Sequence, residues 1–306
     1  MVEMKKALLA ALTCIGLISG IEAKAEVFRT DSERPHKYSE RQEFKKTGTI
    51  TSKRVSASFS IRADIESSEH EIPVVSVSLD GEEVGIMENP AVRGEVYAVM
   101  QIEELDRSNP YPEVLFSSFT GGAHCCGETK VLTSDPSGEI WHEVHLGSFD
   151  GGPKQATDPL ENGHYVIVSR DNRFHYQFDC YACGLAPTRI QKLKGKNIVD
   201  IGNRPEYRQI YRKHLQVIEQ RFSAKEEVIS NGFLAGYVAI KSRVGELSDG
   251  WKQMLLHYNR ESDWGLRECS AGYDQKGNCK KEEVVYKSFP DALRAFLQRT
   301  AYITNE

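Results

Sequence analysis

Apolar and polar residues alternate along the central part of the chain. Over residues 55–62, Val, Ala, Phe and Ile alternate with Ser and Arg, a period of two that is typical of a half-buried strand. The apolar runs 74–79 and 84–87 flank Asp80-Gly81, which predicts a hairpin because glycine tolerates the positive φ of a tight turn. Short strands at this spacing, without long helical crossovers, favour antiparallel sheets. Clusters of Gly, Pro, Asn and Asp separate the further strand-like runs: 96–102, 113–119, 130–132, 140–146, 165–169 and 174–178.

A helical period replaces this alternation after about Pro205. Residues 211–222 place Tyr, Leu, Ile and Phe at spacings of four, three and four, and residues 233–244 repeat these spacings. Residues 251–258 form a third, shorter amphipathic stretch. A fourth begins at Ser288, whose hydroxyl can cap a helix. This part of the chain is therefore predicted to be mostly helical.

These two patterns predict an α+β protein with two domains. We expect residues 51–204 to form an antiparallel β domain, either propeller-blade-like or sandwich-like, and residues 205–306 to form a mostly helical domain with a disulfide loop. Residues 26–50 are polar, lack an apolar period and are expected to form a polar N-terminal arm. The acidic turns at Asp106 and Asp158 each lead into a buried strand. The two turn-and-strand segments are either weak repeats of one supersecondary unit, or they share a pattern that is common to many turns followed by strands.

Residues 1–25 have the three parts of a cleavable secretory signal peptide. A basic start is followed by an uncharged, mostly apolar run over 7–18 and by small residues at Ala23 and Ala25. A membrane-spanning helix needs about 20 apolar residues, and this run is too short. We therefore expect the mature protein to be exported, periplasmic or secreted, and not membrane-spanning. Cys14 lies inside the signal and is expected to be removed with it.

The charge balance argues against one class of partner. The chain has 39 Lys and Arg against 44 Asp and Glu, a formal net charge of -5. A mildly acidic protein has no electrostatic footprint for a nucleic-acid backbone or an anionic membrane surface. No nucleic-acid partner is therefore expected and the partner is otherwise unknown. An exported chain of this kind is a candidate component of the cell envelope.

Six cysteines follow the signal, and their even number in an exported chain favours disulfides. Cys269 and Cys279 bracket a turn-rich stretch that would let a short loop close, and Cys180 and Cys183 are the next closest in sequence. If both of these pairs form, only the neighbours Cys125 and Cys126 remain to pair with each other. The competing arrangement links the first pair of residues to the second pair across strands, and both arrangements remain open. In chain order the six are Cys125, Cys126, Cys180, Cys183, Cys269 and Cys279.

Two other roles for these cysteines compete with disulfide bracing. Cys180 and Cys183 have the spacing of a redox-active dithiol, but they follow a strand-like run and lead into a turn instead of opening a helix. A zinc ion would use His124 with the cysteines, and His142 and His145 could assist. Neighbouring residues of an extended chain point apart, and an oxidising compartment favours disulfides, so no metal site is predicted.

Calcium is the remaining candidate cofactor. The turns at 106–113 and 158–162 bring several oxygen ligands together. Both turns lack the dense Asp-x-Asp-x-Asp-Gly run of a firm calcium site. Solvated turns are therefore the preferred interpretation, and no cofactor is predicted.

Two segments of the β region carry a resemblance to known proteins. Residues 109–114 (Asn-Pro-Tyr-Pro-Glu-Val) and 121–126 (Gly-Gly-Ala-His-Cys-Cys) resemble a group of uncharacterised exported bacterial proteins with the same Gly-Gly-Ala-His-Cys-Cys signature. The stretch 171–187 looks like a second segment of that group. Together, over about residues 70–205, these blocks are similar to FG-GAP or VCBS-type β-propeller blades, whose turns often bind calcium. The resemblance implies a blade-like fold and brings no activity with it.

The leading functional hypothesis is an exported, non-catalytic protein that binds a ligand or associates with the cell envelope. The chain has no Gly-x-Ser-x-Gly, His-Glu-x-x-His or phosphate-binding loop, so no catalytic residue is assigned. One alternative is an envelope hydrolase that uses His124 with a nearby acid such as Glu128. Another is thiol-disulfide exchange through Cys180 and Cys183. The expected binding residues lie in the glycine-rich loop and just after it: Gly121, Gly122, His124 and Glu128.

Overall fold

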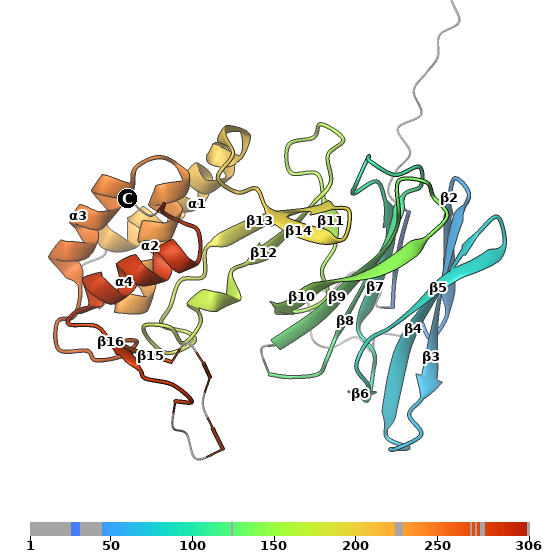
Figure 1. The fold of residues 1–306 in the computed structure, drawn as a ribbon, viewed down its shortest axis with the longest axis horizontal. Coiled ribbons are helices and arrows are strands. Elements are labelled where there is room, and N and C mark those ends of the chain that lie inside the picture. The colour runs from blue at the N-terminus through green and yellow to red at the C-terminus, as the bar shows by residue number, and fades with distance from the viewer. Residues whose placement is uncertain are drawn as a thin grey trace, which may run out of the picture.

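The computed structural model describes most of the chain after the expected signal peptide. That signal and His124 lie outside the described residues. Within them the protein is α+β, with antiparallel sheets in the N-terminal two thirds and helices near the C-terminus (Figure 1). The described ranges are 26–30, 45–123, 125–223, 229–269, 271–272, 274–275 and 279–304.

The first sheet is built from antiparallel neighbours in chain order. Val55, Ala57 and Phe59 of its second strand are buried on one side, as the period of two predicts. The predicted hairpin is confirmed, and Asp80 and Gly81 at its turn have positive φ angles of 52° and 91°. The strands are β2 (Gly48–Ser52), β3 (Val55–Ala63), β4 (His70–Leu79) and β5 (Glu82–Glu88), with β6 (Val92–Arg93) paired to β4.

A second sheet packs face to face against the first. Phe59 and Met87 of the first sheet meet Met100 and Phe116 of the second in one close-packed apolar core. The β part is therefore sandwich-like. The strands of the second sheet, in spatial order, are β1 (Glu26–Arg29), β7 (Ala98–Glu103), β8 (Glu113–Phe119), β9 (Cys125–Ser134) and β10 (Trp141–Asp150).

A third, smaller sheet covers the outer face of the second. Ile167 and Leu193 pack against Leu115 and Val131 of the second sheet, whereas Val166 faces the helices. Consecutive residues of a strand point to opposite sides, so both faces of this sheet are buried. Its strands, in spatial order, are β11 (Ala156–Thr157), β12 (Val166–Arg170), β13 (Thr188–Lys194) and β14 (Asn197–Asp200).

Helices form the C-terminal part of the described chain. Ser230 begins α2 by accepting a hydrogen bond from the Phe233 amide (3.0 Å), and Ser288 caps α4 as predicted. Helix α2 is buried along most of its length and connects the third sheet to the other helices. The helices are α1 (Arg208–Ser223), α2 (Asn231–Arg243), α3 (Leu247–His257) and α4 (Phe289–Arg299), with a hairpin of β15 (Arg267–Glu268) and β16 (Val284–Val285) before α4.

The strand predicted over 174–178 is wrong. This segment is the 3-10 helix η1 (Asn172–Phe174) followed by turns, and Tyr176 has a positive φ of 58°. Phe174 and Phe178 both pack edge-on against Phe296 of α4, with centroid separations of 4.8 and 5.4 Å. Aromatic residues four positions apart can reach one core from a turn as well as from a strand, so their spacing did not distinguish the two.

The polar arm predicted over 26–50 is also wrong where the structure describes it. Strand β1 pairs with β7 and strand β2 with β3, so both segments belong to the sheets. The ring centroids of Phe28 and Phe59 lie 5.3 Å apart, and a Cβ at Gly48 would overlap the Phe28 ring. Short edge strands with one apolar anchor carry too little periodicity to be recognised from sequence.

Candidate functional site

The loop between β8 and β9 ends at a disulfide between neighbouring residues. Cys125 and Cys126 are bonded to each other through their side chains and joined by a cis peptide bond. The Thr120 amide donates to the Cys126 carbonyl (2.9 Å), and the Cys126 amide donates to Thr120 Oγ1 (3.1 Å). Gly121 has a positive φ of 87°, and Gly122 packs so closely on the Cys125 carbonyl that a side chain has no room. The loop is thus fixed locally and stays exposed.

The end of β10 brings a carboxylate next to this loop. Asp150 lies opposite Cys125 in the β9–β10 register, immediately after a β-bulge or irregularity. Lys154 Nζ donates to the Asp150 carbonyl (2.7 Å), which ties the following turn back onto the strand. A Cβ at Gly127 would lie 2.5 Å from the Gly152 carbonyl oxygen, so only glycine permits this approach.

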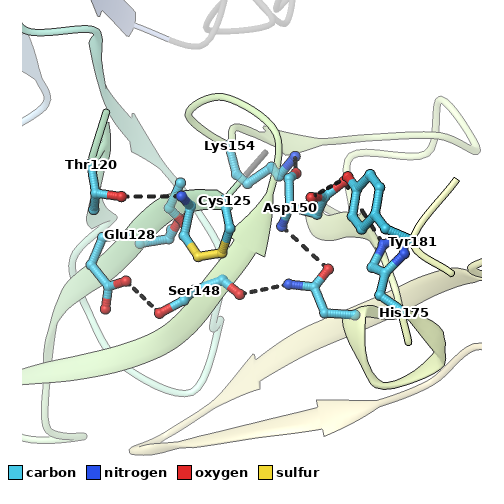
Figure 2. The surroundings of a disulfide bond; sticks show 12 residues. Thr120, Cys125, Glu128, Ser148, Asp150, Lys154, His175 and Tyr181 are labelled. Atoms are coloured by element: carbon cyan, nitrogen blue, oxygen red, sulfur yellow. Dashed lines mark hydrogen bonds and ion pairs between the residues drawn. A yellow bond between two sulfur atoms is a disulfide. The ribbon is translucent and has the colours of Figure 1, made fainter. Parts of the chain in front are cut away.

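Aromatic residues from the segment after η1 surround the Asp150 carboxylate. The Tyr181 hydroxyl donates to Asp150 Oδ1 (2.6 Å), and His175 Nε2 lies 3.8 Å from Oδ2 (Figure 2). The His175 and Tyr181 rings stack with centroids 4.5 Å apart, and the exposed Tyr176 ring lies 5.7 Å from Tyr181. Burial and then the hydrogen bond to Asp150 raise the pKa of Tyr181 to about 12. Tyr181 is therefore a neutral donor at ordinary pH.

A chain of hydrogen bonds connects Glu128 to Asp150. Ser148 Oγ donates to Glu128, Asn172 Nδ2 donates to the Ser148 carbonyl (2.9 Å), and the Asp150 amide donates to Asn172 Oδ1 (3.2 Å), as Figure 2 shows. Burial alone would raise the pKa of Glu128, but hydrogen bonds from Ser148 and His145 outweigh it and lower the pKa. Glu128 is therefore an ionised carboxylate held by two partners.

A second disulfide lies beside Tyr181. Cys180 and Cys183 are bonded, with Cα atoms 5.0 Å apart, and Cys183 is exposed. The Cys183 amide lies 3.1 Å from Cys180 Sγ, and Ser230 Oγ, at the start of α2, donates to the Cys183 carbonyl (2.6 Å). Ligand atoms of Asp179 and the two cysteines lie within 4.8 Å of one another. While the sulfurs are joined they cannot bind a metal as thiolates.

The six described cysteines form three pairs. The third pair, Cys269 and Cys279, has Cα atoms 5.5 Å apart, within the normal range for a disulfide. This is the arrangement by sequence proximity, and the cross-strand alternative is not formed.

In the oxygen-rich turn at 106–113, the Glu113 carboxylate is bound by hydrogen-bond donors of the protein itself. Glu113 accepts hydrogen bonds from the Leu105 and Asp106 amides (2.7 and 3.1 Å), from Asn109 Nδ2 (2.6 Å) and from Thr133 Oγ1 (3.0 Å). Burial raises the pKa of Glu113 to about 7, although each of these donors favours the ionised form. The turn is thus organised around a buried carboxylate.

The structure brings together only part of the predicted binding set. Gly121 and Gly122 lie in the exposed loop, whereas Glu128 is engaged with Ser148 and His145. His124 lies outside the described residues. Sequence reasoning missed a further group because its members come from separate segments. They are Asp150, His175, Tyr176 and Tyr181; the only local signal was a tyrosine between two cysteines.

Comparison with known proteins places this chain among relatives. A family model described as the sll0997 C-terminal domain matches residues 208–301, which span α1 to α4. A probable thylakoid lumen protein, sll0997 of Synechocystis sp., is 41% identical over 281 residues, covering 91% of this chain and 79% of that protein. The chain belongs to the sll0997 family.

A second relative of this chain is longer. The uncharacterized protein y4bJ of Sinorhizobium fredii is 36% identical over 207 residues, covering 67% of this chain and 32% of that protein. The chain therefore spans about a third of y4bJ. No solved structure matches the chain. Among the described residues, no helix is both long and apolar enough to cross a membrane.

Proposed function

We propose that this member of the sll0997 family is an exported, non-catalytic binding protein that works in the periplasm or an equivalent compartment. The name of its Synechocystis relative, a probable thylakoid lumen protein, supports a compartment outside the cytoplasm. Three disulfides support the same assignment because such bonds persist in oxidising compartments. The proposed ligand-contact surface, called the cysteine face, consists of Gly121, Gly122, Cys125, Cys126, Asp150, His175, Tyr176 and Tyr181.

One observation carries this proposal: Asp150 is connected to two disulfides that close very short loops. It lies opposite Cys125 in the β9–β10 register, and its carboxylate binds Tyr181, the neighbour of Cys180. Cys125–Cys126 has a sequence separation of 1 and Cys180–Cys183 a separation of 3. A disulfide stabilises a fold more as its loop grows longer, so these two contribute least to global stability. Their main effect is to fix the local shape of an exposed surface. A surface fixed in advance loses less entropy when a ligand binds.

The chemistry of the cysteine face suits a ligand with both apolar and polar groups. Tyr176 is 60% exposed and presents an aromatic ring. The Asp150 carboxylate accepts from the Tyr181 hydroxyl at Oδ1 and keeps further acceptor sites, and the backbone of the exposed glycine loop adds polar groups. Sugars and short peptides of the cell envelope have this mixed character. Glu128 keeps both of its partners, so no described contact favours the hydrolase alternative.

Nuclear magnetic resonance titration of the mature protein tests the proposal. The probes are soluble envelope disaccharides and short cell-wall peptides. We expect at least one probe to shift amide signals of Gly121, Gly122 and Tyr176 in a saturable way. Tyr176→Ala should weaken this binding, and Leu256→Ala, at a similarly exposed apolar residue on α3, should leave it unchanged. Absence of saturable shifts, or equal loss in both variants, contradicts the proposal.

The structure favours thiol-disulfide exchange through Cys180 and Cys183 as a second candidate. Cys183 is exposed to attack, and the Cys183 amide points at Cys180 Sγ, where it would stabilise a thiolate. A thiolate of a dithiol partner protein would attack Cys183 Sγ, form a mixed disulfide and release Cys180 as the thiolate. The partner's second thiol would then attack the mixed disulfide, leaving the partner oxidised and both cysteines reduced.

A reduction time course tests this second candidate. Dithiothreitol is the probe, and alkylation followed by peptide mass spectrometry reports each cysteine pair. We expect Cys180–Cys183 to be reduced well before Cys269–Cys279, whose cysteines are half-buried. Reduction of both pairs at the same rate, or of Cys269–Cys279 first, argues against exchange activity. This result leaves the binding proposal untouched because it uses a different readout.

A further inference from the structure

A pocket of about 510 Å³ lies in the C-terminal part, on elements other than those of the cysteine face. It is formed by the start of α1, the end of α2 and the segment that follows α4. Its volume falls within the range of about 300–1,000 Å³ that is usual for small-molecule sites. Most of its polar lining can donate hydrogen bonds: Asn203, Arg208, Ser242, Arg243 and Gln298.

Arg243 is the most informative residue of this pocket. Its side chain is only 5% exposed, and an ion pair joins an Nη to Asp200 Oδ2 at 3.3 Å. The guanidinium lies over the Tyr302 ring, 4.3 Å from the centroid. Arg243 Nε is buried without a hydrogen-bond partner among the described residues. A buried donor without an acceptor costs free energy, so this guanidinium is held in place by its ion pair with Asp200 and by the Tyr302 ring.

The charges around the pocket favour an anion. Asp200 is shared between Arg243 and Arg189, each at 3.3 Å, so one carboxylate faces two guanidinium groups. Arg208, at the first position of α1, is exposed on the pocket wall and has no carboxylate partner among the described residues. Asp171, which accepts a hydrogen bond from the pocket residue Tyr302 (3.1 Å), is neutralised by its ion pair with Arg173. Positive charge therefore exceeds negative charge at this site.

We infer that this pocket binds a small oxyanion, a carboxylate or phosphate group, between Arg208 and Arg243. The planar donor fork of arginine matches the paired oxygens of such groups. Asn203, Ser242 and Gln298 supply further donors around the bound group. The site is independent of the proposed binding function because it uses none of the residues of the cysteine face.

Calorimetric titration and thermal unfolding of the mature protein test this inference. The probes are inorganic phosphate and citrate at constant ionic strength, with chloride as the control anion. We expect saturable binding of phosphate or citrate and a rise in melting temperature that chloride does not produce. Citrate without phosphate would identify a carboxylate site, and phosphate without citrate a phosphate site. Arg208→Gln should weaken binding by about tenfold or more, since it removes a charged pair of donors.

Two further variants separate a specific site from general charge. Arg212→Gln removes the same charge from α1, but Arg212 pairs with Glu246 (3.4 Å) and does not line the pocket, so binding should be unchanged. Arg243→Lys keeps the charge and should still weaken binding because the planar fork is lost. The inference is overturned if neither anion binds saturably. Equal loss of affinity in Arg208→Gln and Arg212→Gln, or full affinity in Arg208→Gln and Arg243→Lys, overturns it as well.

Discussion

The sandwich core and the cysteine face lie at successive positions along the chain, in β8 and just after it, but different interactions hold them in place. Phe116, in the middle of β8, is fully buried between the first two sheets and packs near Phe59. A few residues later the same strand runs into Gly121 and Gly122, which are exposed and fixed by a disulfide and backbone hydrogen bonds. The apolar core therefore stabilises the fold, whereas a local disulfide and local hydrogen bonds fix the shape of the proposed binding surface.

Truncation of the core should have the largest effect. Phe116→Ala removes a fully buried ring, and we expect a loss of about 3–5 kcal/mol in the free energy of unfolding. Urea denaturation followed by circular dichroism measures this loss. A decrease below about 1 kcal/mol would show that the two sheets do not share the close-packed core described above.

Stability of the β sandwich should depend on pH, because β8 carries a fully buried carboxylate at its first residue, Glu113. The pKa of Glu113 is raised to about 7 from 4.5. Between these values the folded state keeps the proton and the unfolded state loses it, so stability falls as pH rises through this window. The loss is on the order of 3 kcal/mol and is complete above pH of about 7.

Glu113→Gln is the control for this titration. The variant lacks the ionisable group, so its stability should change less between about pH 4.5 and 7. Chemical denaturation of both proteins at several pH values gives the difference. Parallel pH profiles for the two proteins would show that Glu113 does not titrate in this window.

Removal of one hydroxyl from the cysteine face should have a smaller effect. Tyr181→Phe removes the donor to Asp150 Oδ1 and should cost about 1 kcal/mol of unfolding free energy. Its more informative effect is local: the Asp150 side chain should change its environment while the sandwich core keeps its protection from hydrogen exchange. Loss of protection throughout β8 would mean that the two regions are not energetically separate.

The sequence predicted elements whose residues face one core with a regular period. Strand β3 alternates buried with more exposed residues over its first half, and β4 alternates buried with half-buried residues. The apolar residues of the helices after Pro205 recur every three or four positions. Strands β1 and β2 were missed because each lies at a sheet edge with few apolar anchors. Phe174 and Phe178 were misassigned because a turn satisfies the same aromatic spacing.

The candidate site was harder to predict than the fold. Cys125 and Asp150 become neighbours only through the β9–β10 register and its irregularity. His175 and Tyr181 reach Asp150 from a third segment. Local sequence patterns carry no information about such long-range register. Cysteine spacing was informative because a disulfide between residues close in sequence can be predicted without knowing the fold.

Hydrogen exchange in the double variant Cys125→Ser/Cys126→Ser tests the central claim most directly, with wild type as the reference. The change should cost only about 1 kcal/mol globally because the closed loop is so short. The amides of Thr120 and Cys126, which close the loop, should exchange much faster, while amides within β8 stay protected. Unchanged protection of the two loop amides, or loss of protection across β8 as well, would contradict the claim that the short disulfide fixes this surface independently of the core.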